Sequence, residues 1–146
     1  MPTEMKIRAC AAIILKRGKV LITQRRSDQS FPLKWELPGG HIEPNENRES
    51  CVKRELKEEL GGRITKLRLF ASRETTIGND IMLIHYYLCK LANGGLKRLE
   101  VNDFKWIEPS RYELYDLGPP DKSVLQKLSK TRVLKSSFTC RRNTQI

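Results

Sequence analysis

The sequence predicts an α/β protein in which helices cover a mixed β-sheet. Strand-like apolar runs occur at residues 7–15, 20–23, 67–76, 81–90 and 104–107, and segments with helical periodicity occur at 46–60 and 121–129. A chain that mixes strands and helices in this order favours a sheet with helices on its faces. The length of 146 residues, of which 38% are hydrophobic, fits one domain with its own core.

The strands are expected to form two hairpins. An Arg-Gly-Lys turn at 17–19 joins the first pair of strands, and a Gly-Asn-Asp turn at 78–80 joins the second pair. Between the first hairpin and the first helix, residues 27–37 are expected to be a loop and residues 38–40, Pro-Gly-Gly, a tight turn.

Both helices have recognisable boundaries. The helix at 46–60 is followed by Gly61 and Gly62, and glycine is favoured just after a helix C-terminus. The helix at 121–129 follows the Gly-Pro-Pro segment at 118–120, which cannot continue a preceding helix.

The net charge of +11, from 28 basic and 17 acidic residues, favours polyanionic partners such as nucleotides, nucleic acid or anionic lipid. A solvated basic surface is the plainer interpretation. Five basic residues and no acid lie in 130–146. We therefore expect residues 1–130 to form the domain and residues 131–146 to form a basic, flexible tail.

Two further observations concern the cellular compartment. The chain has no run of 18 apolar residues, and residues 1–8 lack the apolar segment of a signal peptide. We therefore expect a cytoplasmic protein without membrane contact. The four cysteines, Cys10, Cys51, Cys89 and Cys140, form no CxxC motif, so we expect small core side chains and no disulfide framework.

Acidic residues crowd the first predicted helix. Glu55, Glu58 and Glu59 fall within five residues. At about 100° per residue they lie beside or at the edge of the apolar arc that contains Val52 and Leu56. They also lie in the last turns, where the helix dipole disfavours negative charge. One interpretation is a set of solvated acids paired with the neighbouring basic residues Lys53, Arg54 and Lys57.

A divalent cation is the alternative partner for these acids. Arg54 lies four residues before Glu58 and can fix its rotamer, and Glu46 lies at the helix start, where its charge complements the dipole. Gly39 and Gly40 let the backbone approach an ion closely and offer a free carbonyl. Hard cations such as Mg²⁺ prefer oxygen ligands and retain waters, so two or three glutamates and a carbonyl supply a suitable shell.

The spacing of these residues resembles the Nudix box, Gx5Ex7REUxEExGU, in which U is aliphatic. The matching residues are Gly40, Glu46, Arg54, Glu55, Leu56, Glu58, Glu59 and Gly61. The last position departs from the pattern, with Gly62 in place of an aliphatic residue and Ile64 as a candidate substitute in the core. The resemblance covers about residues 5–130. It implies the Nudix fold, an α/β/α sandwich with a mixed β-sheet, and hydrolysis of a nucleoside diphosphate linked to another group.

Within that family the chain is similar to the MutT-type nucleoside triphosphate pyrophosphohydrolases, through residues 22–26, 35–40 and 118–121. This similarity implies Mg²⁺, for which Mn²⁺ can substitute, with the ligands Gly39 (through its carbonyl), Glu55, Glu58, Glu59 and Glu100. It implies catalytic roles for the same glutamates and for Arg54. Arg25 matches a basic residue near the nucleotide, and Asp121 matches a residue that reads the base edge.

Several candidates also have a purely structural interpretation. Asp121, at the start of the last predicted helix, is equally suited to be its N-cap. Trp35 and Phe31 are able to stack on a base, although Trp35 is also suited to the core. His41 either touches phosphate or is a solvated loop residue, and His85 lies in an apolar strand, where a core role is the commoner one.

The expected reaction is metal-dependent attack of water on a phosphorus atom of a nucleoside triphosphate, with modified or oxidised deoxynucleotides among the candidates. The products are a nucleoside monophosphate and pyrophosphate. Glu58, Glu59 and Glu100 are the candidate bases. The alternatives are removal of pyrophosphate from triphosphorylated RNA ends, which the charge suits, and hydrolysis of other nucleoside-diphosphate-linked substrates. A silent nucleotide- or RNA-binding module is disfavoured, because all ligand glutamates are present. Both a monomer and a homodimer are compatible with the sequence.

Overall fold

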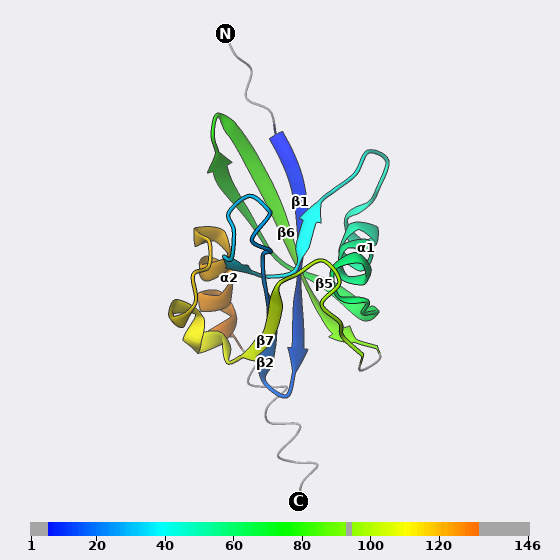
Figure 1. The fold of residues 1–146 in the computed structure, drawn as a ribbon, viewed down its shortest axis with the longest axis vertical. Helices are drawn as coiled ribbons and strands as arrows, with labels where there is room; N and C mark the ends of the chain where they lie inside the picture. Colours follow the sequence, from blue (N-terminus) through cyan, green and yellow to red (C-terminus); the bar gives the residue numbers. More distant parts are fainter. Residues whose placement is uncertain (1–5, 93–94, 132–146) are drawn as a thin grey trace, which may run out of the picture.

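The computed structural model describes residues 6–92 and 95–131, which form one mixed sheet with a helix on each face (Figure 1). The strands are β1 (Lys6–Lys16), β2 (Lys19–Gln24), β3 (Trp35–Glu36), β4 (Gly39–His41), β5 (Ile64–Ile77), β6 (Asp80–Leu91) and β7 (Asp103–Ile107). The helices are α1 (Arg48–Leu60), the short 3₁₀ helix η1 (Pro109–Leu114) and α2 (Pro119–Ser129).

Strand β1 organises the sheet. The strand order is β3-β2-β1-β6-β5, with β4 also paired to β1 and β7 to β2. β1 runs parallel to β6 and antiparallel to both β2 and β4. β4 pairs with the first half of β1, through Ala9–His41, Cys10–Gly40 and Ala11–Gly39, whereas β2 pairs with its last residues. The glycine pair is thereby fixed against the central strand.

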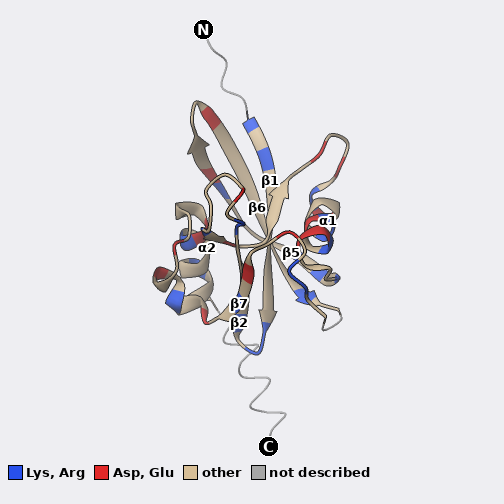
Figure 2. Ribbon diagram, in the orientation of Figure 1, with Lys and Arg blue, Asp and Glu red and all other residues tan. Residues whose placement is uncertain are grey.

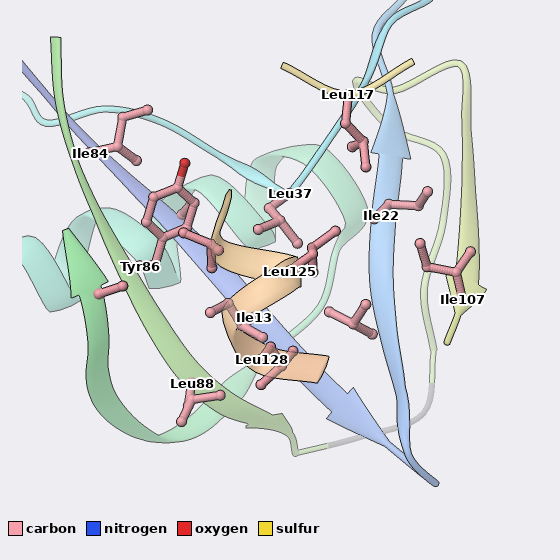
Figure 3. Packing of buried hydrophobic residues seen from close by; sticks show 14 of the residues in the cluster. Ile13, Ile22, Leu37, Ile84, Tyr86, Leu88, Ile107, Leu117, Leu125 and Leu128 are labelled. Atoms are coloured by element: carbon pink, nitrogen blue, oxygen red, sulfur yellow. The ribbon is translucent and has the colours of Figure 1, made fainter. Parts of the chain in front are cut away.

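Alternating side chains of the strands fill two cores. On the α2 side, β1, β2, β6 and β7 contribute Ile13, Ile22, Tyr86 and Ile107, which pack on the apolar face of α2 (Figure 3). On the α1 side, alternate residues of the same strands pack against the helix residues Cys51, Val52, Leu56 and Leu60. This two-sided burial explains why β1 reads as a nearly continuous apolar run.

The ends of α1 explain its position. Asn47 is the N-cap, and its side chain accepts a hydrogen bond from the Ser50 N–H. Gly61 ends the helix in the left-handed conformation, with φ 67°. At Gly62, a Cβ atom would lie 2.9 Å from a methyl group of Leu96. Leu96 therefore fills the space that an aliphatic residue at 62 would take, and Ile64 is buried in the same core.

The α/β class, the covering helices and both hairpins are confirmed. The prediction of a tight turn at 38–40 is wrong for Gly39 and Gly40, which belong to β4, and the loop at 27–37 contains the short strand β3. Helix α1 starts at Arg48 rather than 46, and α2 starts at Pro119 rather than 121. Strands of two or three residues arise from tertiary pairing rather than from local sequence pattern, so the sequence alone does not reveal them.

Two further predictions meet the structure here. The expectation of no disulfide is wrong for one pair, because Cys10 and Cys51 are joined, whereas Cys89 is a free, buried core residue as expected. Cys140 and the tail proposed at 131–146 lie outside the described residues, apart from Thr131. None of the described helices is long and apolar enough to cross a membrane.

Candidate active site

A cavity of about 190 Å³ lies between the loop after β2, strand β4, helix α1 and the segment before β7. Its lining residues are Arg25, Gln29, Glu36, Gly39, Glu55, Glu59, Glu100 and Val101. Four of them are glutamates, although Lys and Arg dominate the chain as a whole. In Figure 2 an acidic part of α1 lies beside the middle of the sheet. The cavity therefore concentrates acidic side chains in a basic protein.

Glu59 is the most enclosed of these acids. It is 8% exposed, and its Oε2 atom is buried without a hydrogen-bond partner among the described residues. Burial, together with the nearby carboxylates of Glu36 and Glu55, raises the pKa of Glu59 to about 9 against a smaller opposing effect from the Gly39 backbone. A buried carboxylate oxygen without a partner costs free energy unless a cation or a proton occupies its position.

Glycine is required at two positions of β4, one against α1 and one against β1. A Cβ atom at Gly40 would overlap the Glu55 carboxylate, and one at Gly39 would overlap the Cys10 carbonyl of β1. The glycine pair thus lets α1 and β1 approach β4 closely enough to bring Gly39, Glu55 and Glu59 to one cavity. The sequence predicted a close approach of this backbone to an ion; the structure shows its close approach to α1 and β1, and the approach to an ion stays a prediction.

Arg54 is the hub of an ion-pair network on the same helix. Its guanidinium donates to both carboxylate oxygens of Glu46, at 2.7 and 2.9 Å, and to the His41 carbonyl at 3.0 Å. It also donates to Glu55 at 2.9 Å and to Glu58 at 3.2 Å. The hydrogen bonds from Arg54 lower the pKa of Glu46 to about 2. The expected Arg54–Glu58 contact is present. The bidentate partner of Arg54, however, is Glu46, which the sequence analysis considered only as a favourable charge at the helix start.

Glu58 differs from its neighbours. Its side chain is 45% exposed, contacts Arg54, and does not line the cavity. Of the predicted glutamate ligands, Glu55, Glu59 and Glu100 therefore line the cavity together, and Glu58 lies outside this lining. Its roles as a ligand and as a base stay predictions.

Glu100 reaches the cavity on a segment that is attached to the C-terminus of α1. The backbone N–H groups of Leu99 and Glu100 both donate to the Glu59 carbonyl at 3.1 Å, and that of Lys97 donates to the Leu60 carbonyl at 2.8 Å. These bonds satisfy helix carbonyls that otherwise lack partners. Although the segment has no sequence motif, its hydrogen bonds place Glu100 beside Glu59.

Arg25 lines the cavity from the start of the loop after β2. It donates to the Ser30 carbonyl at 2.6 Å and to Glu36 at 3.2 Å. Burial raises the pKa of Glu36 to about 7, in spite of the opposing charge of Arg25. Glu36 and Gln29 were not predicted as site residues. The only sequence signal for Glu36 was its place before the Leu-Pro-Gly-Gly segment.

Asp121 lies outside the cavity lining. It is 9% exposed; its Oδ1 accepts from the Tyr86 hydroxyl at 2.6 Å, and its Oδ2 accepts from the Leu37 N–H at 2.9 Å. Burial raises its pKa. The N-cap of α2 is Gly118, so the N-cap alternative for Asp121 is wrong. Both carboxylate oxygens have protein partners, and base reading by Asp121 stays a prediction.

The aromatic and histidine candidates have different surroundings. Trp35 packs against the α2-side core, meets the Tyr115 ring edge-on at 5.6 Å, and carries the Lys105 ammonium over its face. Phe31, in contrast, is 57% exposed on the loop beside the cavity. His85 is buried and contacts Ser72 at 2.9 Å, in agreement with a core role.

The residues present fit a hard divalent cation. Among residues 6–92 and 95–131, no three acidic, histidine or cysteine side chains are already drawn together tightly enough to enclose an ion. The cavity nevertheless offers carboxylate oxygens from Glu55, Glu59 and Glu100 and the backbone of Gly39. The partnerless Oε2 of Glu59 is the donor atom that such an ion would satisfy.

Comparison with known proteins gives relatives of nearly full length. The NUDIX domain model matches residues 5–128. The chain is 32% identical over 120 residues to the CTP pyrophosphohydrolase of Escherichia coli (strain K12), covering 82% of this chain and 89% of the relative. It is 30% identical over 118 residues to the 8-oxo-dGTP diphosphatase of Buchnera aphidicola subsp. Schizaphis graminum, covering 81% and 89%. It is also 31% identical over 129 residues to the nucleoside triphosphatase NudI of Escherichia fergusonii, covering 77% and 89%.

Solved structures share the fold. The solution structure of the E. coli ORF135 protein aligns with a TM-score of 0.72 and 31% identity, over 84% of this chain and 88% of that one. A MutT protein from Methanosarcina mazei Go1 aligns with a TM-score of 0.79 at 18% identity, over 87% and 95%, which supports the fold alone. The chain belongs to the NUDIX family and is a Nudix hydrolase that acts on nucleotide phosphoanhydride bonds.

Proposed function

We propose that this protein hydrolyses nucleoside triphosphates to a nucleoside monophosphate and pyrophosphate, with Mg²⁺ as cofactor and Mn²⁺ as a substitute. The observation that carries the proposal is the buried, partnerless Oε2 of Glu59 in a cavity that also contains Glu55 and Glu100. These carboxylates are costly to keep ionised in a buried site without a cation, which supports a bound metal ion.

The cation would be held by Glu55, Glu59, Glu100 and the Gly39 carbonyl. Glu58, which lies outside the cavity lining, would be a further ligand. When bound, it would neutralise charge on the polyphosphate and acidify a bound water. Arg54 holds the carboxylate of Glu55 in a fixed orientation through the 2.9 Å hydrogen bond. Positioning of this kind typically changes metal affinity or activity by about 10- to 100-fold.

The attack of water, the transfer of its proton and the binding of phosphate depend on residues in and beside the cavity. A water molecule attacks one phosphorus atom, the bond from that atom to its bridging oxygen breaks, and a carboxylate accepts the proton of the water. Glu59 and Glu100 line the cavity and Glu58 does not; all three remain candidate bases. Arg25 lines the same cavity and contacts Glu36, and its guanidinium suits an anionic phosphate oxygen.

Substrate choice within the triphosphates rests on the relatives. One is named for CTP and another for 8-oxo-dGTP, so canonical and oxidised nucleotides are both candidates. Phe31 is the exposed aromatic residue nearest in sequence to the cavity residues Arg25 and Gln29, and it is our candidate for stacking on a base. Removal of pyrophosphate from triphosphorylated RNA is the second candidate, favoured by the net charge of +11.

A substrate panel tests the proposal. Purified protein is incubated with Mg²⁺ and each of the common and oxidised nucleoside triphosphates, dinucleoside polyphosphates, nucleotide sugars and 5′-triphosphate RNA, and the products are separated. We expect nucleoside monophosphate and pyrophosphate from at least one triphosphate. Turnover of RNA alone would favour the second candidate, and turnover of nucleotide sugars alone would contradict both.

A further inference from the structure

The disulfide between Cys10 and Cys51 joins the central strand β1 to helix α1. The two Cα atoms are 6.4 Å apart, within the usual range for a disulfide. The residues are 2% and 0% exposed, and 41 positions separate them in the sequence. Cys89, on β6 in the same core, is free and serves as an internal comparison.

This cross-link touches the elements that build the candidate metal site. Cys10 is paired with Gly40 in the β1–β4 register. The sulfur of Cys51 lies 3.8 Å from the Gly40 carbonyl oxygen and 3.6 Å from that of His41. The Nη2 atom of Arg54 lies 3.9 Å from the same sulfur, and the Nη1 atom of the same guanidinium donates to Glu55. The backbone at Gly39 and Gly40 and the carboxylate of Glu55 are therefore all within one or two contacts of the disulfide.

We propose that Cys10 and Cys51 form a reversible redox site that couples the thiol state of the protein to its affinity for the divalent cation. The coupling rests on the metal-dependent function proposed above. The co-reactant is a dithiol reductant: its two sulfurs become a disulfide, and the Cys10–Cys51 bond is replaced by two thiols, which take up the two electrons and two protons. Oxidised dithiol compounds drive the reverse reaction.

The physical basis is the change in sulfur separation. Bonded sulfurs are about 2.05 Å apart. Non-bonded heavy atoms rest at about 3.5–4.0 Å. Reduction therefore has to separate the two sulfurs by about 1.5 Å or more in an interior that is close-packed. Because Cys10 lies on β1 beside β4 and Cys51 lies on α1, we expect this movement to shift the glycine pair and the first turns of α1 relative to each other.

Two consequences follow. The oxidised form has the arrangement in which Gly39, Glu55 and Glu59 share one cavity, so reduction is expected to weaken cation binding. By reciprocity, bound cation makes the disulfide harder to reduce by the same factor. Because both sulfurs are buried, exchange also requires α1 to open from β1, and a cation that ties α1 to β4 slows that opening.

The first experiment establishes the bond. Protein purified without reductant is denatured, alkylated and digested, and the peptides are identified by mass spectrometry. A linked Cys10–Cys51 peptide is expected, with Cys89 alkylated. Alkylation of Cys10 and Cys51 after treatment with an oxidised dithiol would overturn the proposal, whatever the activity of the protein.

The second experiment measures coupling by Mn²⁺ affinity, read from the paramagnetic signal of free Mn²⁺ rather than from turnover. Reduction with a dithiol should lower the affinity of the wild type, and of the control Cys89→Ala, by at least about threefold. Cys10→Ala should show no response to reductant, and Cys51→Ala provides the same test if Cys10→Ala does not fold. Equal affinity in oxidised and reduced wild type would overturn the coupling.

The third measurement separates this proposal from the proposed function. The midpoint of the thiol–disulfide equilibrium in a dithiol buffer should shift by the same factor with saturating Mn²⁺ as the Mn²⁺ affinity shifts with reduction. Loss of Mn²⁺ binding in both redox forms would contradict the metal-dependent function. Normal Mn²⁺ binding and hydrolysis with no shift of the midpoint would contradict only the redox coupling.

Discussion

Replacement of Glu59 by glutamine should make the folding stability of the cation-free protein less sensitive to pH. The side chain is 8% exposed, and burial raises its pKa from the ordinary 4.5 to about 9. Between those values the folded chain retains a proton that the unfolded chain has released, so the free energy of unfolding falls as pH rises. Glutamine has a similar shape and no proton to lose, which removes this dependence.

The expected size follows from the pKa shift. Each pH unit in the window costs about 1.4 kcal/mol, so the wild type should lose about 2–3 kcal/mol between pH 5 and pH 7 through Glu59 alone. The Glu59→Gln variant should not show this loss. At pH 7 without divalent cations it should therefore unfold at a higher urea concentration than the wild type, and at pH 5 the difference should nearly vanish.

The assay is urea unfolding followed by tryptophan fluorescence at pH 5 and pH 7, with a chelator and then with saturating Mg²⁺. Glu58→Gln is the matched control, because Glu58 lies on the same helix with a side chain that is 45% exposed. Its stability should change by no more than about 1 kcal/mol at either pH. With Mg²⁺, the wild type should gain more stability than Glu59→Gln.

Two results would refute this reasoning. One is a Glu59→Gln variant that is less stable than the wild type at pH 7 without cations. The other is a difference between the two proteins that is the same at pH 5 and pH 7. Either result would show that the Glu59 carboxylate is stabilised within the folded protein and does not need a bound cation.

Four further predictions follow from the site. Mn²⁺ affinity should rise up to about tenfold per pH unit between pH 6 and 8, because binding displaces the proton of Glu59; a flat titration would contradict this. Arg54→Ala should weaken Mn²⁺ binding about 10-fold or more, whereas unchanged binding with lost turnover would assign Arg54 to the substrate. Asp121→Asn should change the order of kcat/KM among the four bases if Asp121 reads the base. An unchanged order would mean that Asp121 has only a structural role, through its hydrogen bond with Tyr86. Deletion of residues 132–146 should leave mononucleotide hydrolysis unchanged and, if RNA is a substrate, should flatten the salt dependence of RNA binding.

Most of the fold could be predicted because its signals are local. The long strands contain apolar runs, helix α1 ends at Gly61, and Gly78, in the turn between β5 and β6, has a positive φ that glycine adopts readily. Strands β3 and β4 could not be predicted, because they have two and three residues and exist only through pairing with β2 and β1. The disulfide was missed for a related reason, since 41 residues separate cysteines that the sheet brings together.

The site was predictable where the spacing on one helix fixes geometry. Glu55 and Glu59 are one turn apart, and both line the cavity; their roles as metal ligands stay predictions. Spacing did not reveal that Glu58 lies outside the cavity lining. It also did not reveal that Arg54 makes two hydrogen bonds to Glu46, which precedes α1. Glu36 was missed, because its importance comes from burial beside Arg25 rather than from a motif.

The most direct test of the central claim is the Mg²⁺-dependent hydrolysis of nucleoside triphosphates in the wild type and in Glu59→Gln, with both products quantified. The account predicts equal amounts of nucleoside monophosphate and pyrophosphate from the wild type, none above background with a chelator, and turnover at least about 10²-fold lower in Glu59→Gln. Release of orthophosphate and nucleoside diphosphate, or undiminished turnover in Glu59→Gln, would contradict it.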